Sequence, residues 1–506
     1  MTDRAEPSWG WARAILALTL LALLVPASRA SADVAIGGPP PEVLSGAALF
    51  HASSADGRRV VFSSRRRLAR DDRDRLLDVY LRAGGRTTLL SRSPVREKAE
   101  FVAATPDART VLVGEEGPLA GTGTLFALLS TDGRRVFLLS EEQLLPEDED
   151  DRRDVYERRD GRLRLVSPGT PGSVRLHAIA ADGSRVVVST NAGLDPGDVD
   201  GFDDIYSYGP EGTTLISAGG LRSCPGFSAE RERCEVEFAA ASDDATRVYF
   251  ETADSLSPLD ADLSTDVYRG GPGGVALVSA GPGDALRSAA RLGAISADGR
   301  RVLFVGGGPF AGLAPDTYCG LYERRGGRTA LISEVRGKPV AVAGCDEEEV
   351  ALSEDGSAVV FPNGGGAQDR SASLYRRQGG RTTLVSGPPR EALGGFLKHV
   401  SSDGSRVAFL TWKRLVRADI DGGFDLYTSG PRGFTLLTLG PAGGNGAHFG
   451  PPGSLIGDVF PQFGGASADG RRVFFSTQER LLRRDRNEDT DLYERGPAGL
   501  RLVSTR

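Results

Sequence analysis

The sequence predicts an all-β protein that folds as a single β-propeller of four-stranded antiparallel blades. The first observation is the heptapeptide SADGRRV, which occurs identically at residues 54–60, 296–302 and 467–473. The second is that each copy is followed by Asp-Val-Tyr, or a relative of it, and then by Leu-Val-Ser. The third is the spacing of about 40–50 residues between copies, which is typical of propellers and other repeat arrays. Close variants of the heptapeptide begin at Ser130, Ala180, Ser242, Ser353 and Ser401.

Each repeat contains the signals for four strands. An Asp-Gly pair between two apolar runs indicates a hairpin, because Gly adopts positive φ without strain and Asp hydrogen-bonds to the backbone of its own turn. Gly84-Gly85 marks a second tight turn in the first repeat. The predicted strands of this repeat are residues 49–53, 60–63, 78–81 and 87–91. Four antiparallel strands per repeat correspond to one propeller blade.

The repeats follow one another with little else between them. The full units are residues 46–91, 125–167, 174–217, 236–279, 291–333, 347–386, 396–438 and 463–504. Residues 101–114 form a half unit that has the first hairpin but lacks the Asp-Val-Tyr half. We therefore expect eight blades, with seven or nine left open. The half unit could be an inserted hairpin, or a thin ninth blade formed with residues 125–129.

The first 32 residues have the features of a secretory signal peptide. Arg4 and Arg13 supply positive charge, residues 14–25 are apolar, and Ala30-Ser31-Ala32 provides small residues for cleavage. An uncleaved membrane anchor is the alternative. A Pro-Gly-rich lead at residues 33–45 precedes the propeller at 46–506. We expect an exported chain, periplasmic, envelope-associated or extracellular, with no membrane span after cleavage.

Net charge and cysteine content indicate which kinds of ligand and covalent bond to expect. A net charge of −7 over 506 residues argues against a nucleic-acid-binding protein. Four cysteines in an exported chain favour disulfides, and the ligand spacing of a zinc site is missing. We expect Cys224 to pair with Cys234 across one loop, and Cys319 with Cys345 between neighbouring repeats.

The repeat also resembles a known family. The pattern Ser-x-Asp-Gly-x-Arg-Val-x-Phe, followed by Asp-Val-Tyr-x-Arg and Leu-Val-Ser, is similar to the WD40-like propeller repeats of TolB-like proteins. The resemblance covers nearly all of the chain after the leader and implies the propeller fold. This chain lacks the separate N-terminal α/β domain of the translocation protein of that family and has more units than its six blades. The partners of that protein are therefore not carried over.

A motif of spaced carboxylates, D-x-[DN]-x-x-x-D, joins the two halves of six units. Its members are Asp72, Asp74 and Asp78; Asp148, Asp150 and Asp154; Asp198, Asp200 and Asp204; Asp260, Asp262 and Asp266; Asp419, Asp421 and Asp425; and Asp485, Asn487 and Asp491. Calcium binds hard oxygen ligands from alternate positions of a flexible loop, so these residues are candidate calcium ligands. The alternative is structural: the side chains cap turns, or pair with the arginine of the Asp-Gly hairpin, such as Arg59 or Arg185.

Signals of catalysis are few. His51, His177 and His399 lie in or near first strands, which line the channel of a propeller, so a cluster there is conceivable. No G-x-S-x-G motif occurs, and we expect no peptidase domain after the last repeat. We therefore expect a non-enzymatic scaffold that binds an envelope protein, a peptide or a glycan, with no cofactor apart from possible calcium. The alternative is a lyase or glycosidase with its site at the central channel.

Overall fold

The structure of the chain is a computed structural model. It describes residues 47–91, 99–114, 124–167, 174–198, 201–219, 235–260, 264–281, 289–308, 310–311, 319–342, 350–363, 373–387, 395–443, 461–487 and 489–506. The predicted leader and Pro-Gly-rich segment, together with Cys224, Cys234 and Cys345, lie outside these residues.

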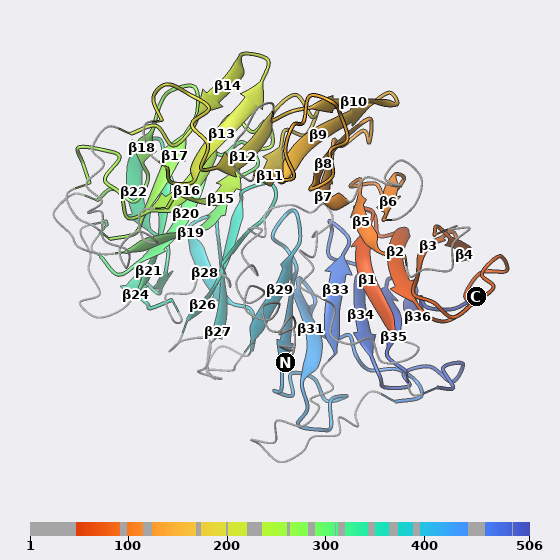
Figure 1. The fold of residues 1–506 in the computed structure, drawn as a ribbon. Coiled ribbons are helices and arrows are strands. Elements are labelled where there is room, and N and C mark those ends of the chain that lie inside the picture. The colour runs from red at the N-terminus through yellow and green to blue at the C-terminus, as the bar shows by residue number, and fades with distance from the viewer. Residues whose placement is uncertain are drawn as a thin grey trace, which may run out of the picture.

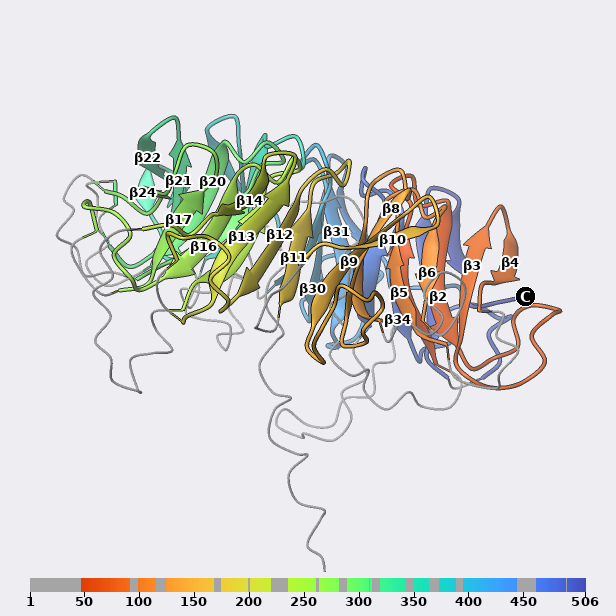
Figure 2. The same cartoon turned by 45° about the horizontal axis from the view of Figure 1, so that its top comes forward.

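Eight four-stranded antiparallel sheets form a ring, which confirms the predicted all-β propeller (Figure 1). Each sheet contains four consecutive strands, so every blade is made from one continuous segment of the chain. Figure 2 shows the blades side by side around the ring. The strands of the first four blades are β1 (Ala48–Ser53), β2 (Arg59–Ser64), β3 (Asp78–Ala83) and β4 (Arg86–Leu89); β7 (Thr124–Leu129), β8 (Arg135–Ser140), β9 (Asp154–Arg159) and β10 (Arg162–Leu165); β11 (Arg175–Ile179), β12 (Val186–Thr190), β13 (Asp204–Gly209) and β14 (Gly212–Leu215); and β15 (Glu237–Ala241), β16 (Val248–Thr252), β17 (Asp266–Gly270) and β18 (Ala276–Leu277).

The second half of the ring repeats this pattern. Its strands are β19 (Ala290–Ile295), β20 (Arg301–Gly306), β21 (Gly320–Arg325) and β22 (Arg328–Leu331); β25 (Ala351–Leu352), β26 (Ala358–Asn363), β27 (Ser373–Gln378) and β28 (Arg381–Leu384); β29 (Phe396–Val400), β30 (Val407–Thr411), β31 (Asp425–Gly430) and β32 (Gly433–Leu436); and β33 (Gln462–Ala466), β34 (Val473–Thr477), β35 (Asp491–Gly496) and β36 (Gly499–Leu502). A small hairpin, β23 (Glu334–Val335) and β24 (Lys338–Pro339), lies outside the blades.

The half unit forms a thin blade of its own. Its strands β5 (Phe101–Ala104) and β6 (Val111–Val113) make a separate two-stranded sheet, and β7 pairs with β8 instead of joining them. One side of this hairpin packs against Val61 and Val79 of the first blade. The other side packs against Ala127 and Leu138 of the next full blade. The ring therefore has eight four-stranded blades and one two-stranded blade.

The Asp-Gly turn is held by a recurring set of hydrogen bonds. In the first blade the Ser54 hydroxyl donates to Asp56 Oδ1 at 2.6 Å, and the same oxygen accepts the Arg58 N–H at 3.0 Å. Gly57 donates its N–H to the Ser54 carbonyl at 2.7 Å and has a φ of 62°. A Cβ at Gly57 would lie 2.7 Å from Cδ of Arg472 in the last blade. Glycine is therefore required both by the backbone conformation and by the neighbouring blade.

These turns also bond to one another around the ring. In six cases the residue after the first residue of the turn donates its backbone N–H to the equivalent carbonyl of the following blade. The pairs are Ala468 to Ala55 (2.7 Å), Ala55 to Pro106 (3.3 Å), Thr131 to Ala181 (2.8 Å), Ala181 to Asp243 (2.7 Å), Asp243 to Ala297 (2.8 Å) and Ser402 to Ala468 (2.7 Å). Pro106 has no N–H to donate, so the series is interrupted at the thin blade.

The hydrophobic core lies between blades. Phe304 on β20 is fully buried, with its ring centroid 5.2 Å from that of Phe310 and 5.4 Å from that of Tyr322. Its cluster includes Tyr249 and Val267 of the preceding blade. Val60 and Phe62 of the first blade share a cluster with Phe474 of the last blade. Because each blade is covered by its neighbours, the sheets stabilise one another only as a closed ring.

Two further observations concern membrane-spanning helices and disulfide bonds. Within the described residues, no helix is long and apolar enough to cross a membrane. Cys319 is disulfide-bonded. The other three cysteines lie outside the described residues, so the pairing of Cys319 with Cys345 and of Cys224 with Cys234 stays a prediction.

The burial of Phe304 leads to a stability prediction. We expect Phe304→Ala to lower the free energy of unfolding by about 3–5 kcal/mol, because it leaves a cavity between two blades. Chemical denaturation monitored by circular dichroism measures this loss. Arg300→Ala, at an exposed turn position of the same blade, is the matched control. A loss below about 1 kcal/mol at Phe304 would show that the inter-blade core does not carry the stability assigned to it.

Candidate functional site

The spaced aspartates lie together at one end of the ring. Consecutive strands of each blade are antiparallel, so the connection between the second and third strands lies opposite the Asp-Gly turns. Loops with the D-x-[DN]-x-x-x-D motif occupy this connection in six blades: β2–β3, β8–β9, β12–β13, β16–β17, β30–β31 and β34–β35. We call this the acidic-loop end, and the opposite one the turn end.

The first aspartate of each loop accepts a hydrogen bond from the tyrosine eight residues later. The phenol of Tyr80 lies 2.5 Å from Oδ2 of Asp72, and both residues are buried. The other pairs are Tyr156 with Asp148, Tyr206 with Asp198, Tyr268 with Asp260, Tyr427 with Asp419 and Tyr493 with Asp485. Burial and the neighbouring carboxylate raise the pKa of Tyr80 above its usual range, so the phenol stays protonated as a donor. The tyrosine of the Asp-Val-Tyr motif, on the third strand, is thus a hydrogen-bond partner of the loop. The sequence analysis did not identify this role.

The third aspartate is held from the end of the fourth strand. In the first blade, the Ser91 hydroxyl donates to Asp78 Oδ1 at 2.7 Å and accepts the Val79 N–H at 3.1 Å. The same arrangement links Asp154 to Ser167, Asp204 to Ser217, Asp266 to Ser279, Asp425 to Thr438 and Asp491 to Ser504. The serine of Leu-Val-Ser therefore joins the end of the loop to its own blade by hydrogen bonds.

The middle residue caps the backbone within the loop. Its Oδ1 accepts the N–H two residues later at 2.8–2.9 Å in the pairs Asp74 with Leu76, Asp150 with Arg152, Asp421 with Gly423 and Asn487 with Asp489. The predicted turn-capping role is therefore confirmed for the described loops. The middle residues Asp200 and Asp262 lie outside the described residues.

The predicted alternative, in which the aspartate loops pair with the arginine of the Asp-Gly hairpin, is wrong. That arginine lies at the turn end, where Arg59 donates to the Asp107 carbonyl of the following blade and Arg185 pairs with Glu211. The strand length separates the two ends, so these arginines do not reach the aspartate loops.

Three of the loops bring their carboxylates into one place. Oxygens of Asp72, Asp74 and Asp78, of Asp148, Asp150 and Asp154, and of Asp419, Asp421 and Asp425 lie within 4.8 Å of one another in each group. Burial raises the pKa of Asp154 to about 6 and that of Asp425 to about 7, with repulsion from the other carboxylates of the loop adding to both shifts. The fold thus concentrates negative charge at these positions.

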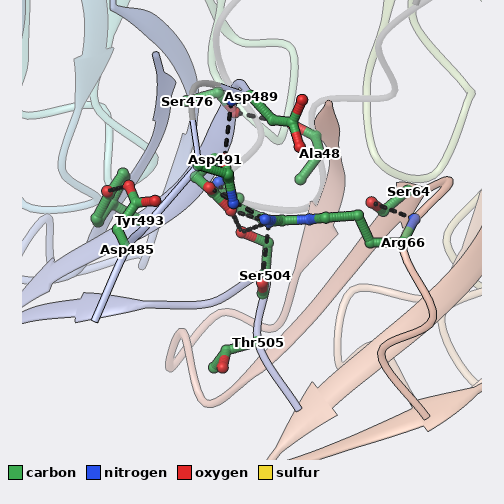
Figure 3. A network of polar contacts seen from close by, with 12 residues as sticks. Ala48, Ser64, Arg66, Ser476, Asp485, Asp489, Asp491, Tyr493, Ser504 and Thr505 are labelled. Atoms are coloured by element: carbon green, nitrogen blue, oxygen red, sulfur yellow. Dashed lines mark hydrogen bonds and ion pairs between the residues drawn. The ribbon is translucent and has the colours of Figure 1, made fainter. Parts of the chain in front are cut away.

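In the last blade, an arginine side chain from the neighbouring first blade binds the acidic loop. Arg66, which follows β2 in the first blade, forms an ion pair with the buried carboxylate of Asp491 (Figure 3). Its guanidinium also donates to the carbonyl and hydroxyl oxygens of Ser504, both at 3.1 Å. Sequence analysis missed Arg66, which is 425 residues away from its partner.

A cavity opens between the second and third full blades at the acidic-loop end. Its volume is about 480 Å³, and its lining includes Glu141, Arg152, Arg153, Arg175, Asn191 and Asp203. Arg153 Nε lies 2.9 Å from Glu141 Oε1, and Arg175 pairs with Asp203. Charges of both signs are therefore held in fixed positions around this cavity.

The three described histidines lie between blades. His51 stacks on Phe101 and His177 stacks on Phe238, each with ring centroids 4.7 Å apart, and His399 stacks on Phe463. Burial lowers the pKa of each to about 4, so all three are neutral near pH 7. The side chain of His51 contacts the Ser63 hydroxyl, and that of His177 contacts the Ser189 hydroxyl. The histidines thus pack the blades together and do not assemble the channel site that we considered.

Comparison with known proteins finds similarity to solved structures alone. No protein-family model matches the chain, and no curated protein does. Similar solved structures include the β-propeller domain of the Trilobed protease from Pyrococcus furiosus (12% identity, 77% of this chain and 98% of that one, TM-score 0.36). A puromycin-hydrolyzing peptidase of Mycobacterium tuberculosis has 13% identity over 90% of this chain and 61% of its own, with a TM-score of 0.37. TolB from Acinetobacter baumannii has 12% identity over 70% and 66%, with a TM-score of 0.27. The predicted resemblance to TolB-like propellers agrees with these matches.

The prediction that the chain is not an enzyme requires correction. Two of the three structures just named are a peptidase and the propeller domain of a protease. The absence of a G-x-S-x-G motif does not justify the non-enzymatic assignment, because one fold can host sites of unrelated function.

The hydrogen bond between Tyr80 and Asp72 leads to a second prediction. We expect Tyr80→Phe to lower the free energy of unfolding by about 1–3 kcal/mol, because it removes a donor from a buried carboxylate. Tyr322→Phe is the matched control, since Tyr322 donates to the neutral Gly308 carbonyl in a blade without the motif. There we expect about 0.5–1.5 kcal/mol. Equal losses in thermal or chemical denaturation would contradict the assigned role of the carboxylate.

Proposed function

We propose that this protein is an exported propeller that binds a peptide segment of a partner protein at its acidic-loop end. Export follows from the signal-like residues 1–32. The observation that carries the binding proposal is the cavity of about 480 Å³ between the second and third full blades. Loops on a rigid scaffold commonly form binding sites, and this cavity is built entirely from such connections and adjacent strand ends.

The chemistry of the cavity favours a peptide. Arg153 and Glu141, like Arg175 and Asp203, place a cation beside an anion. The arginines can donate hydrogen bonds to carbonyls and carboxylates of a peptide, and the carboxylates can accept them from its amide N–H groups. The large apolar side chains exposed in the described part of the chain are Leu259 and Ile420, and both belong to loops at this same end. Protein-binding surfaces combine apolar side chains with polar groups, and this end of the ring offers both.

Site-specific photo-crosslinking in cells that produce the protein tests this proposal. A photoreactive residue replaces Asn191 in the cavity or Arg300 at the turn end, and both positions are exposed. We expect adducts with a defined partner from position 191 and none from position 300. The double variant Arg153→Glu, Arg175→Glu reverses the charge of the cavity and should abolish the adduct. Adducts from position 300 alone, no adduct from position 191, or adducts that persist in the double variant would contradict the proposal.

A further inference from the structure

The loop between β30 and β31 contains a carboxylate oxygen without a hydrogen-bond partner. Asp419 is 5% exposed, and its Oδ2 accepts the Tyr427 hydroxyl at 2.5 Å. Its Oδ1 is buried and has no partner in the described part of the chain. A buried charged oxygen without a hydrogen-bond partner costs free energy. A ligand from solution that binds this oxygen would remove that cost.

The other carboxylates of this loop converge on the same place. Oxygens of Asp419, Asp421 and Asp425 lie within 4.8 Å of one another. Asp421 and Asp425 accept hydrogen bonds through Oδ1 from the Gly423 N–H and the Thr438 hydroxyl. None of the ion pairs among the described residues involves these three aspartates. The guanidinium of Arg414 binds this loop through the backbone carbonyl of Asp421 and not through a carboxylate.

Comparison with the last blade shows what such a loop accepts. There, the loop between β34 and β35 receives the guanidinium of Arg66, which stands two residues after the end of β2 in the following blade (Figure 3). The corresponding residue of the blade after the β30–β31 loop is Glu479, two residues after the end of β34. The equivalent position is therefore an arginine beside one loop and a glutamate beside the other.

We propose that Asp419, Asp421 and Asp425 bind a divalent cation, with Glu479 of the next blade adding negative charge, and that calcium is the natural ion. Calcium takes six to eight oxygen ligands from a loop of this kind, including backbone carbonyls and water. Magnesium requires a compact octahedral arrangement and retains its water, so it fits three spaced carboxylates less well. This inference is independent of the partner proposed above.

The loop also contains its own spectroscopic probe. Trp412 packs edge-on against Phe424, with ring centroids 5.3 Å apart, and Phe424 precedes Asp425. The other two tryptophans of the chain, Trp9 and Trp11, lie in the predicted leader. Terbium, a luminescent substitute for calcium, bound at this loop would therefore be excited through Trp412 in the exported protein.

Terbium luminescence and calcium calorimetry on the exported protein test the site. We expect luminescence excited through tryptophan, displaced by calcium at millimolar concentration or below. Asp421→Asn keeps the acceptor for the Gly423 N–H but removes a charged ligand, and should weaken binding at least about tenfold. Glu479→Arg places a guanidinium where Arg66 stands in the last blade, and should abolish the signal. Asp469→Asn, in the Asp-Gly turn at the opposite end, is the matched control and should leave it unchanged.

Each result decides the proposal. Weaker binding in Asp421→Asn and loss in Glu479→Arg, with the control unchanged and all variants folded by circular dichroism, would support it. No displacement of terbium by millimolar calcium, or equal binding in the wild-type, Asp421→Asn and Glu479→Arg proteins, would overturn it. If Glu479→Arg fails to fold, Asp421→Asn alone decides. The variant Trp412→Phe should remove the luminescence and keep the calorimetric binding, which assigns the signal to this loop.

Discussion

Contact between the last blade and the first is the constraint on which the whole ring depends. A blade can bury both faces only between two neighbours, so an open ring would expose two apolar sheet faces to water. Val60 and Phe62 of the first blade close this contact against Phe474 of the last. No strand is exchanged between the two blades, since each is built from four consecutive strands. Closure therefore depends on side chains and on bonds such as that from the Ala468 N–H to the Ala55 carbonyl.

The two ends of the ring use their polar groups differently. At the turn end, serine, aspartate and glycine of each repeat hold a tight turn, and backbone bonds then join the turns of neighbouring blades. At the acidic-loop end, carboxylates bind the tyrosine and the serine of their own blade, and at ring closure Arg66 of the first blade also binds Asp491 of the last. The turn end is thus rigid and internally satisfied. The acidic-loop end retains a cavity, exposed apolar side chains and excess negative charge, which are the properties that a binding surface requires.

Local signals in the sequence predicted most of the fold. The Asp-Gly pairs located the hairpins, as at Gly57, where positive φ and the close approach of Arg472 both require glycine. The half unit was ambiguous because residues 125–129 could pair with either neighbour, and only the complete β7–β10 blade decides which. The aspartate spacing identified six candidate loops, and the structure brings the carboxylates together in three of the described ones. Arg66 could not be found, because ring closure alone brings it to Asp491, 425 residues away.

Hydrogen–deuterium exchange of the variant Arg66→Gln tests the role of ring closure most directly. The substitution leaves the buried Asp491 carboxylate without its cation, at a cost of about 1–3 kcal/mol. We predict faster exchange in β1–β4 and β33–β36 than in the wild-type protein, with a smaller change in the distant blade β19–β22. Arg471→Gln, which breaks an exposed pair with Asp469, should leave all blades unchanged. Exchange in Arg66→Gln that matches this control would contradict the claim that the first and last blades hold the ring together.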